Sequence, residues 1–154
     1  MASAALLFCV GVHAQGIVFS PILSPSQPVA GPPPLDEQRL FALGMIETGN
    51  RDGEVGKAGE VSRYQILPTV WKAYSRRADY LNTQAAVEVA RQHWTWLAGY
   101  FLEKTGRQPS DFDMYVMWNT RFGYYARRGF STARLEPVVR DRAQRFVNLV
   151  NRRG

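Results

Sequence analysis

The chain has 154 residues, the usual size of one domain, and its 45% of apolar residues suffice for a single packed core. Its one cysteine, Cys9, excludes an internal disulfide and a cysteine-based metal site. The formal net charge of +6 is uneven, because residues 121–154 hold nine arginines and two acids. A basic surface attracts anionic polymers such as nucleic acid, membranes or bacterial cell wall, whereas the simpler interpretation of these arginines is a solvated helix face.

The first 34 residues are typical of an export signal followed by a linker. Residues 4–12 form an apolar run too short for a membrane span, and a small-residue cleavage pattern ends at Ala14, although no Lys or Arg lies near Met1. We therefore expect a signal peptide over residues 1–14 and a periplasmic or extracellular protein. Residues 15–34 contain six prolines and no charge, which predicts a linker without a core of its own. The folded domain is expected at residues 35–154.

The rest of the chain has the apolar spacing and the capping residues of helices. Apolar side chains recur at every third or fourth position, and Asp, Asn, Ser, Pro or Gly bounds the segments. Residues 50–63 lack this period and suit a loop or a small hairpin. In chain order, the expected helices run from Asp36 to about Thr48, from about Pro68 to Tyr74, from Asn82 to just before Gly106, from Ser110 through Asn119, and onward from Ser131 and Thr132 with Leu135, Val139, Phe146 and Val150. The predicted fold class is mostly α, with at most a small β-hairpin or loop element.

Glu47 is the strongest candidate for chemistry. It follows Leu43 and Ile46 at the C-terminal end of the first predicted helix. A carboxyl group against apolar walls is poorly solvated, so its pKa should rise and it can hold a proton near neutral pH and donate it. An isolated glutamate near a helix end is more often a solvated surface group, so the position decides little without its neighbours.

Three motifs around Glu47 carry a family resemblance. They are Ile46-Glu47-Thr48-Gly49-Asn50, Ala58-Gly59-Glu60-Val61-Ser62-Arg63-Tyr64-Gln65-Ile66-Leu67-Pro68 and Tyr115-Val116-Met117-Trp118-Asn119. In this order and spacing they resemble the catalytic domain of soluble lytic transglycosylases, which share the lysozyme-like fold. In that family a Gly-Leu-Met-Gln segment places its Gln eighteen residues after the catalytic glutamate, the same separation as from Glu47 to Gln65. The resemblance covers about residues 37–150, with Met117-Trp118-Asn119 in place of the family's Ala-Tyr-Asn.

The resemblance implies a lysozyme-like fold and cleavage of the β-1,4 bond between N-acetylmuramic acid and N-acetylglucosamine in peptidoglycan. Glu47 would be the single acid and base, and the products would carry 1,6-anhydromuramyl ends. No cofactor, metal or nucleic acid is implied, and we expect a monomer without a transmembrane segment whose partner is the glycan strand. The residues expected to contact the glycan are Thr48, Ser62, Tyr64, Gln65, Asn119 and Tyr124.

The chain departs from the family pattern at several positions. Thr48 stands where serine is usual, and Ser62-Arg63-Tyr64 replaces Gly-Leu-Met, which makes the expected floor of the cleft more polar and bulkier. Phe146-Val147 replaces a Tyr-Val pair whose phenol bonds the catalytic glutamate in the family. That bond is absent here unless Tyr124 or Tyr125 supplies the phenol.

Other functions stay open. A second carboxylate across the cleft would make the protein a lysozyme-type hydrolase, and Glu60 is the candidate because it lies in the loop after Glu47, with Asp52 and Glu54. A wall-binding module without catalysis and a nucleic-acid-binding protein that uses the arginine-rich end are the remaining alternatives. His93 stands alone in its predicted helix, and the sequence predicts no metal cluster.

Overall fold

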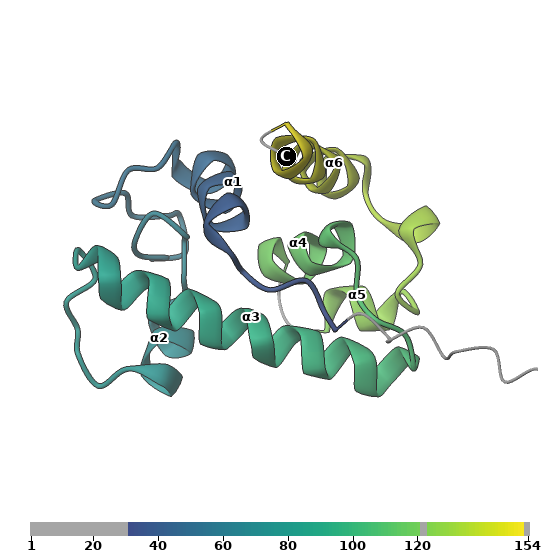
Figure 1. Ribbon diagram of the computed structural model, residues 1–154, viewed down its shortest axis with the longest axis horizontal. Helices are drawn as coiled ribbons and strands as arrows, with labels where there is room; N and C mark the ends of the chain where they lie inside the picture. The colour runs from purple at the N-terminus through teal and green to yellow at the C-terminus, as the bar shows by residue number, and fades with distance from the viewer. Residues whose placement is uncertain (1–30, 121–122, 153–154) are drawn as a thin grey trace, which may run out of the picture.

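The regular structure of this protein is helical. The computed structural model describes residues 31–120 and 123–152, and Figure 1 shows how their helices are arranged. The helices are α1 (Glu37–Thr48), α2 (Pro68–Tyr74), α3 (Thr83–Thr105), α4 (Asp111–Asn119), α5 (Tyr124–Arg127), the 3₁₀ helix η1 (Thr132–Arg134) and α6 (Pro137–Asn151). Within the described ranges, β pairing consists of one antiparallel bridge between Val61 and Ile66. The predicted mostly α class is confirmed, whereas the predicted signal peptide and residues 15–30 of the predicted linker lie outside the described residues.

The two ends of α1 fix the place of Glu47. At the start, the Asp36 carboxylate accepts a hydrogen bond from the Arg39 N–H at 2.9 Å, as an N-cap does. At the other end, Gly49 takes a left-handed φ of 68°, and its N–H and that of the next residue bond back to carbonyls of the helix. Glycine reaches this φ without a steric cost from a side chain. The stop leaves Glu47 in the last turn of α1.

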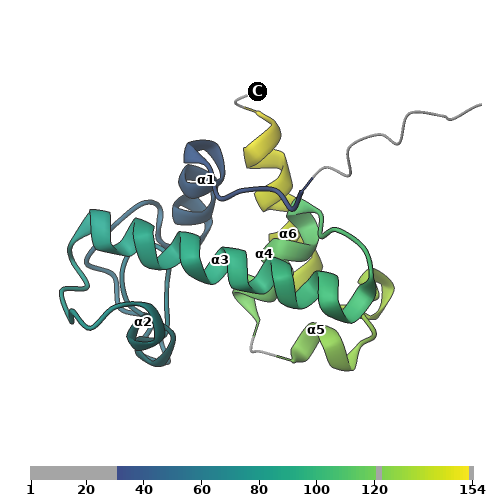
Figure 2. The ribbon, with the colours of Figure 1, turned by 60° about the horizontal axis from the view of Figure 1, so that its bottom comes forward.

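The core lies where α4 packs against α3 and α6. Met114, Tyr115 and Val116 of α4 are completely buried, and α3 contributes the buried rings of Trp94 and Phe101. α6 packs against α1 as well as against α4, and Figures 1 and 2 show α1 and α6 close together beyond the long axis of α3. The first and last helices of the described chain therefore lie side by side, and both ends of the domain contribute to one region.

The segment between α4 and α6 differs from the prediction. The chain forms the short helix α5, which the apolar spacing does not predict. The last helix begins at Pro137 rather than soon after Ser131, because proline lacks an N–H group and suits the first turn of a helix. Glu136 before it is extended, with ψ of 144°. Leu135 is therefore buried in the connection between η1 and α6 and is not carried by the helix.

Candidate active site

Glu47 lies at a junction of α1, α4 and α6. Its side chain is 7% exposed. The Tyr115 hydroxyl, from α4, donates to Glu47 Oε1 at 2.7 Å, and Arg142 Nη2, from α6, donates to Glu47 Oε2 at 3.2 Å. Arg142 Nε also donates to the Tyr115 hydroxyl oxygen at 3.2 Å. The three side chains therefore form a closed ring of hydrogen bonds, with one member from each helix.

This environment raises the pKa of Glu47 above its ordinary value. Burial is the main cause, because the charged carboxylate loses its hydration. The Tyr115 hydrogen bond, the charge of Arg142 and the Asn119 side chain lower the pKa without cancelling the effect of burial. The rise that the apolar neighbours predict is thus confirmed. Such a carboxyl group holds its proton at a higher pH than a solvated glutamate does, as a general acid must.

Asn119 is one of the predicted site residues that lie near Glu47. It is the last residue of α4, four positions after Tyr115, so the two share one face of that helix. The Asn119 side chain lowers the pKa of Glu47 by hydrogen bonding, which places its amide within reach of the carboxyl group. An amide there can also bond an N-acetyl or hydroxyl group of a sugar.

Glu60 is the loop acid that acts on Glu47. Its negative charge raises the pKa of Glu47, and its own Oε2 accepts a hydrogen bond from the Ala58 N–H at 2.9 Å. The other two acids of this loop are paired with arginines, Asp52 with Arg63 at 2.6 Å and Glu54 with Arg51 at 2.9 Å. Of the three acids, Glu60 is therefore the candidate for a second carboxylate.

Three residues expected to contact the glycan are buried. Thr48, Ser62 and Tyr64 are 7%, 2% and 3% exposed. The Thr48 hydroxyl donates to the Arg63 carbonyl at 3.0 Å, which ties the end of α1 to the following loop. The Ser62 hydroxyl accepts from the Tyr64 N–H at 3.3 Å, and the Tyr64 carbonyl accepts from Trp118 Nε1 at 3.1 Å. These side chains support the loop from within, and their contact with a glycan stays a prediction.

Gln65 is held in a tight turn of the same loop. Its φ is 51°, in the left-handed region that residues other than glycine rarely adopt, and Ser62 has a φ of 64°. The Gln65 Nε2 donates to the carbonyls of Glu54 and Ser62, each at 3.3 Å. A Cβ at Gly56 would lie 2.4 Å from Gln65 Oε1, so a side chain there would displace the end of the Gln65 side chain. The amide is thus fixed by the loop, and its binding role also stays a prediction.

The phenol that bonds Glu47 does not come from Tyr124 or Tyr125. The Tyr124 hydroxyl oxygen accepts from the Glu136 N–H at 3.4 Å, and the Tyr125 hydroxyl donates to Asp113 at 2.8 Å. Neither tyrosine replaces the missing phenol, because the Tyr115 hydroxyl bonds Glu47 instead. The Tyr115 ring stacks on Phe146, with centroids 5.1 Å apart and planes at 19°. The aromatic ring of α6 lacks a hydroxyl group, and the neighbouring ring of α4 supplies one.

Comparison with known protein families, curated proteins and solved structures finds no match to this chain. The site is therefore interpreted from its own geometry. Sequence reasoning missed Tyr115 and Arg142 as partners of Glu47. The spacing of Tyr115 and Asn119 is a signal that could have found the tyrosine, since residues four apart share a helix face. For Arg142 the sequence offers only its place among many arginines.

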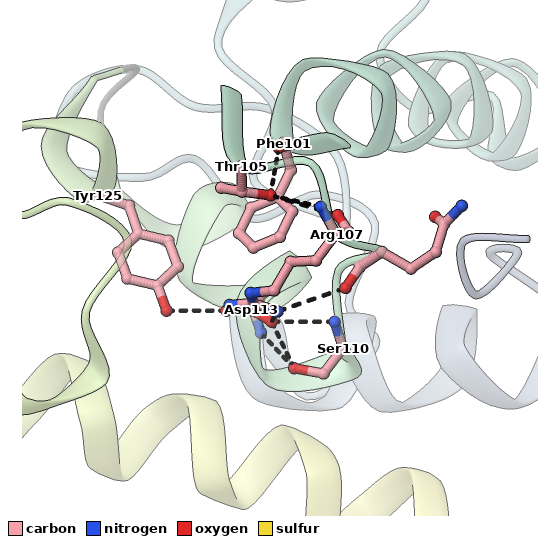
Figure 3. A network of polar contacts seen from close by, with 7 residues as sticks. Phe101, Thr105, Arg107, Ser110, Asp113 and Tyr125 are labelled. Carbon is pink, nitrogen blue, oxygen red and sulfur yellow. Dashed lines mark hydrogen bonds and ion pairs between the residues drawn. The ribbon is translucent and has the colours of Figure 1, made fainter. Parts of the chain in front are cut away.

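A second polar network surrounds Asp113 and is shown in Figure 3. The Asp113 side chain is 3% exposed and accepts hydrogen bonds from Arg107, Ser110 and Tyr125. Burial alone would raise the pKa of Asp113, but these donors prevail and hold it below its usual value. A carboxylate that stays ionised cannot donate a proton near neutral pH. Asp113 has a structural role instead: it forms the capping box of α4 with Ser110, and its bond from Tyr125 ties α4 to α5.

Among the described residues, His93 is the one histidine, and it lies among aromatic rings. Its ring stacks on Trp96, and its Nδ1 lies 3.3 Å from the Tyr74 hydroxyl. Burial lowers the pKa of His93 to about 4. Among the described residues, no group of three or more His, Cys, Asp or Glu side chains could hold a metal ion. In the same ranges, no helix combines the length and the apolar character needed to cross a membrane.

Proposed function

We propose that this protein is a lytic transglycosylase with a lysozyme-like fold. Its substrate would be peptidoglycan, and the bond cut would be the β-1,4 bond between N-acetylmuramic acid and N-acetylglucosamine. The observation that carries the proposal is the Glu47 carboxyl group, 7% exposed, with a raised pKa and with hydrogen bonds from two other helices. The order and spacing of the three motifs around it support the same family.

Glu47 first acts as the general acid. Its proton passes to the glycosidic oxygen as the bond from that oxygen to the anomeric carbon of the muramyl residue breaks. The N-acetyl group of the same sugar supports the positive charge that develops at the anomeric carbon. Burial favours the protonated form of Glu47 before the step. The Tyr115 and Arg142 hydrogen bonds stabilise the carboxylate that the step leaves behind.

Glu47 then acts as the general base. Its carboxylate takes the proton of the muramyl C6 hydroxyl group, and the C6 oxygen bonds to the anomeric carbon. The ring that closes is a 1,6-anhydromuramyl end, and Glu47 regains its proton for the next cycle. No water is consumed. Binding of the sugar already holds its own hydroxyl group near the reacting carbon, which favours this intramolecular attack. Asn119, whose side chain hydrogen-bonds Glu47, would bond the N-acetyl group.

A lysozyme-type hydrolase is the competing proposal, and Glu60 is the observation that favours it. Its negative charge raises the pKa of Glu47. A hydrolase would use Glu60 to activate a water molecule across the sugar ring. The hydrogen bond from the Ala58 N–H to Glu60 Oε2 holds this carboxylate within its own loop, which favours the single-carboxylate route.

The test of catalysis is the variant Glu47→Gln. The amide keeps the shape and can still accept from Tyr115, but it has no proton to donate, so clearing of a peptidoglycan suspension should fall by about 10²- to 10⁴-fold. Glu54→Gln is the matched control, because it removes a carboxylate from the neighbouring loop and should leave the rate unchanged. Activity of Glu47→Gln close to wild type, with an unchanged fold by circular dichroism, would refute the assignment. A wild-type protein that binds peptidoglycan and cuts nothing would instead be a wall-binding module.

A further inference from the structure

The guanidinium of Arg142 contacts both other members of the Glu47 ring. Its Nε donates to the Tyr115 hydroxyl oxygen and its Nη2 donates to Glu47 Oε2, each at 3.2 Å. The Arg142 side chain is 36% exposed, whereas that of Glu47 is 7% exposed. Arg142 therefore reaches the buried carboxyl group from the solvent side. Its first fork is the Nε–H on Tyr115, and its second fork is the Nη2–H on Glu47. No part of the sequence pattern around Glu47 assigns a role to it.

The first fork fixes the direction of the Tyr115 hydroxyl proton. A phenol has one proton and accepts through its oxygen. Because the Arg142 Nε–H points at that oxygen, the phenol proton must point elsewhere, and Glu47 Oε1 is its acceptor at 2.7 Å. The neighbouring ring of Phe146 stacks on Tyr115 and holds the plane of the phenol. Arg142 thus keeps Oε1 occupied as an acceptor.

The second fork distinguishes the two protonation states of Glu47. With Oε1 engaged by Tyr115, the acid proton of Glu47 belongs on Oε2. A protonated Oε2 carries a hydrogen atom and is a weaker acceptor than a carboxylate oxygen, so the hydrogen bond from Arg142 Nη2 is stronger with the carboxylate.

We propose that Arg142 is a positioning residue that orients Tyr115 and stabilises the Glu47 carboxylate in the interval between its two proton transfers. The catalytic part of this role rests on the proposed function, whereas the pairing itself does not. The charged and titratable groups that face Glu47 are Tyr115 on α4, Arg142 on α6 and Glu60 in the loop after α1. Of these, Arg142 is the cation, and its removal should favour the protonated carboxyl group.

Titration of the Glu47 carboxyl carbon by NMR tests the pairing directly. In protein with ¹³C-labelled glutamate side chains, the resonance that disappears in Glu47→Gln is that of Glu47. Arg142→Gln should raise the pKa of Glu47, and Arg142→Lys should raise it less, because lysine keeps the charge without the second fork. Arg145→Gln is the matched control: it removes an exposed arginine of the same helix and should leave the titration unchanged.

Kinetics on peptidoglycan tests the catalytic part. Arg142→Gln should lower kcat by about 10- to 100-fold, as expected for loss of a hydrogen bond to a charged group, with little change in KM. The pH at which kcat falls to half of its maximum on the alkaline side should rise in this variant, together with the pKa of Glu47. Arg142→Lys, the more conservative change, decides the question if Arg142→Gln does not fold.

The two hypotheses fail in different ways. A Glu47 titration that is the same in wild type, Arg142→Gln and Arg142→Lys overturns the role of Arg142. A wild-type protein that cuts no peptidoglycan overturns the proposed function, and the titration still measures the pairing in that case. A fall in kcat with neither a shifted rate profile nor a shifted titration means a structural role, and also overturns the inference.

Discussion

At the scale of single residues, Glu47 is controlled by opposing effects on one carboxyl group. Burial raises its pKa, whereas Tyr115, Arg142 and Asn119 lower it. A general acid that must also become a base needs both kinds of influence, because its proton has to leave and return in each cycle. The influence that lowers the pKa comes from outside α1, through Tyr115 of α4 and Arg142 of α6.

Removal of the Tyr115 hydroxyl should shift this balance. Tyr115→Phe keeps the ring that stacks on Phe146 but takes away the donor to Glu47 Oε1. The pKa of Glu47 should rise further, the rate profile on peptidoglycan should move to higher pH, and the maximal rate should fall by roughly tenfold. Tyr80→Phe, which removes a phenol from the loop before α3, serves as the control. A Tyr115→Phe profile that overlays the wild type would show that the hydrogen bond has no part in the activity.

Part of the site could be predicted from the sequence. The apolar residues before Glu47 and the glycine after it predict a poorly solvated carboxyl group at a helix end, because both signals lie within a few residues. Arg142 stands 95 positions from Glu47, so its contact exists only once α6 has packed on α1. Tyr124 and Tyr125 lie close to the end of α4, yet the start of α5 directs their hydroxyl groups to Glu136 and Asp113.

At the scale of helices, local chemistry sets most of the boundaries. Several helix ends are predictable from the sequence because each depends on one side chain or one glycine within a single turn. They are the N-caps Asp36, Asn82 and Ser110 and the C-terminal stops Gly49 and Gly106. The four-residue helix α5 has no side-chain cap and too few residues for an apolar period, so nothing in the sequence marks it. Pro137, not Ser131, starts α6.

The Asp113 network should be a large contributor to stability. Asp113→Ala removes the capping box of α4 and leaves the buried Tyr125 hydroxyl and the Ser110 N–H without their acceptor. We expect the free energy of unfolding to fall by about 2 to 4 kcal/mol, the sum of a lost cap and an unsatisfied buried donor. Urea unfolding followed by circular dichroism measures it. The exposed Asp141→Ala on α6 should change little, and equal losses in the two variants would contradict the assignment.

At the scale of the whole molecule, half-buried His93 should make the fold sensitive to acid. Burial lowers the pKa of His93 from 6.5 to about 4, so the folded state resists a proton that the unfolded chain accepts. This contribution to stability is complete above pH 6.5 and is lost as the pH falls toward 4. His93→Gln should therefore flatten the fall in the free energy of unfolding across that window. A slope as steep as that of wild type would mean that other groups cause it.

The arginine-rich end should add attraction to the anionic cell wall. Replacement of Arg152 and Arg153 by Gln should weaken binding to peptidoglycan at low salt and matter less at high salt, since salt screens charges over about 10 Å at 0.1 M. Arg152 is exposed after α6, and Arg153 lies outside the described residues. The control replaces Arg76 and Arg77, which are exposed and carry the same charge. The same loss of binding in both double variants would indicate net charge alone, and no salt-dependent difference would exclude the role.

The reaction product tests the central claim most directly. Peptidoglycan is digested with the wild-type protein in ¹⁸O water, and mass spectrometry identifies the new ends of the glycan strands. With Glu47 as the single acid and base, the ends should be 1,6-anhydromuramyl, without label and without new reducing ends, and they should be absent after digestion with Glu47→Gln. Incorporation of ¹⁸O at the cut ends, lost in Glu60→Gln, would show that water is the nucleophile and that the protein is a hydrolase with two carboxylates.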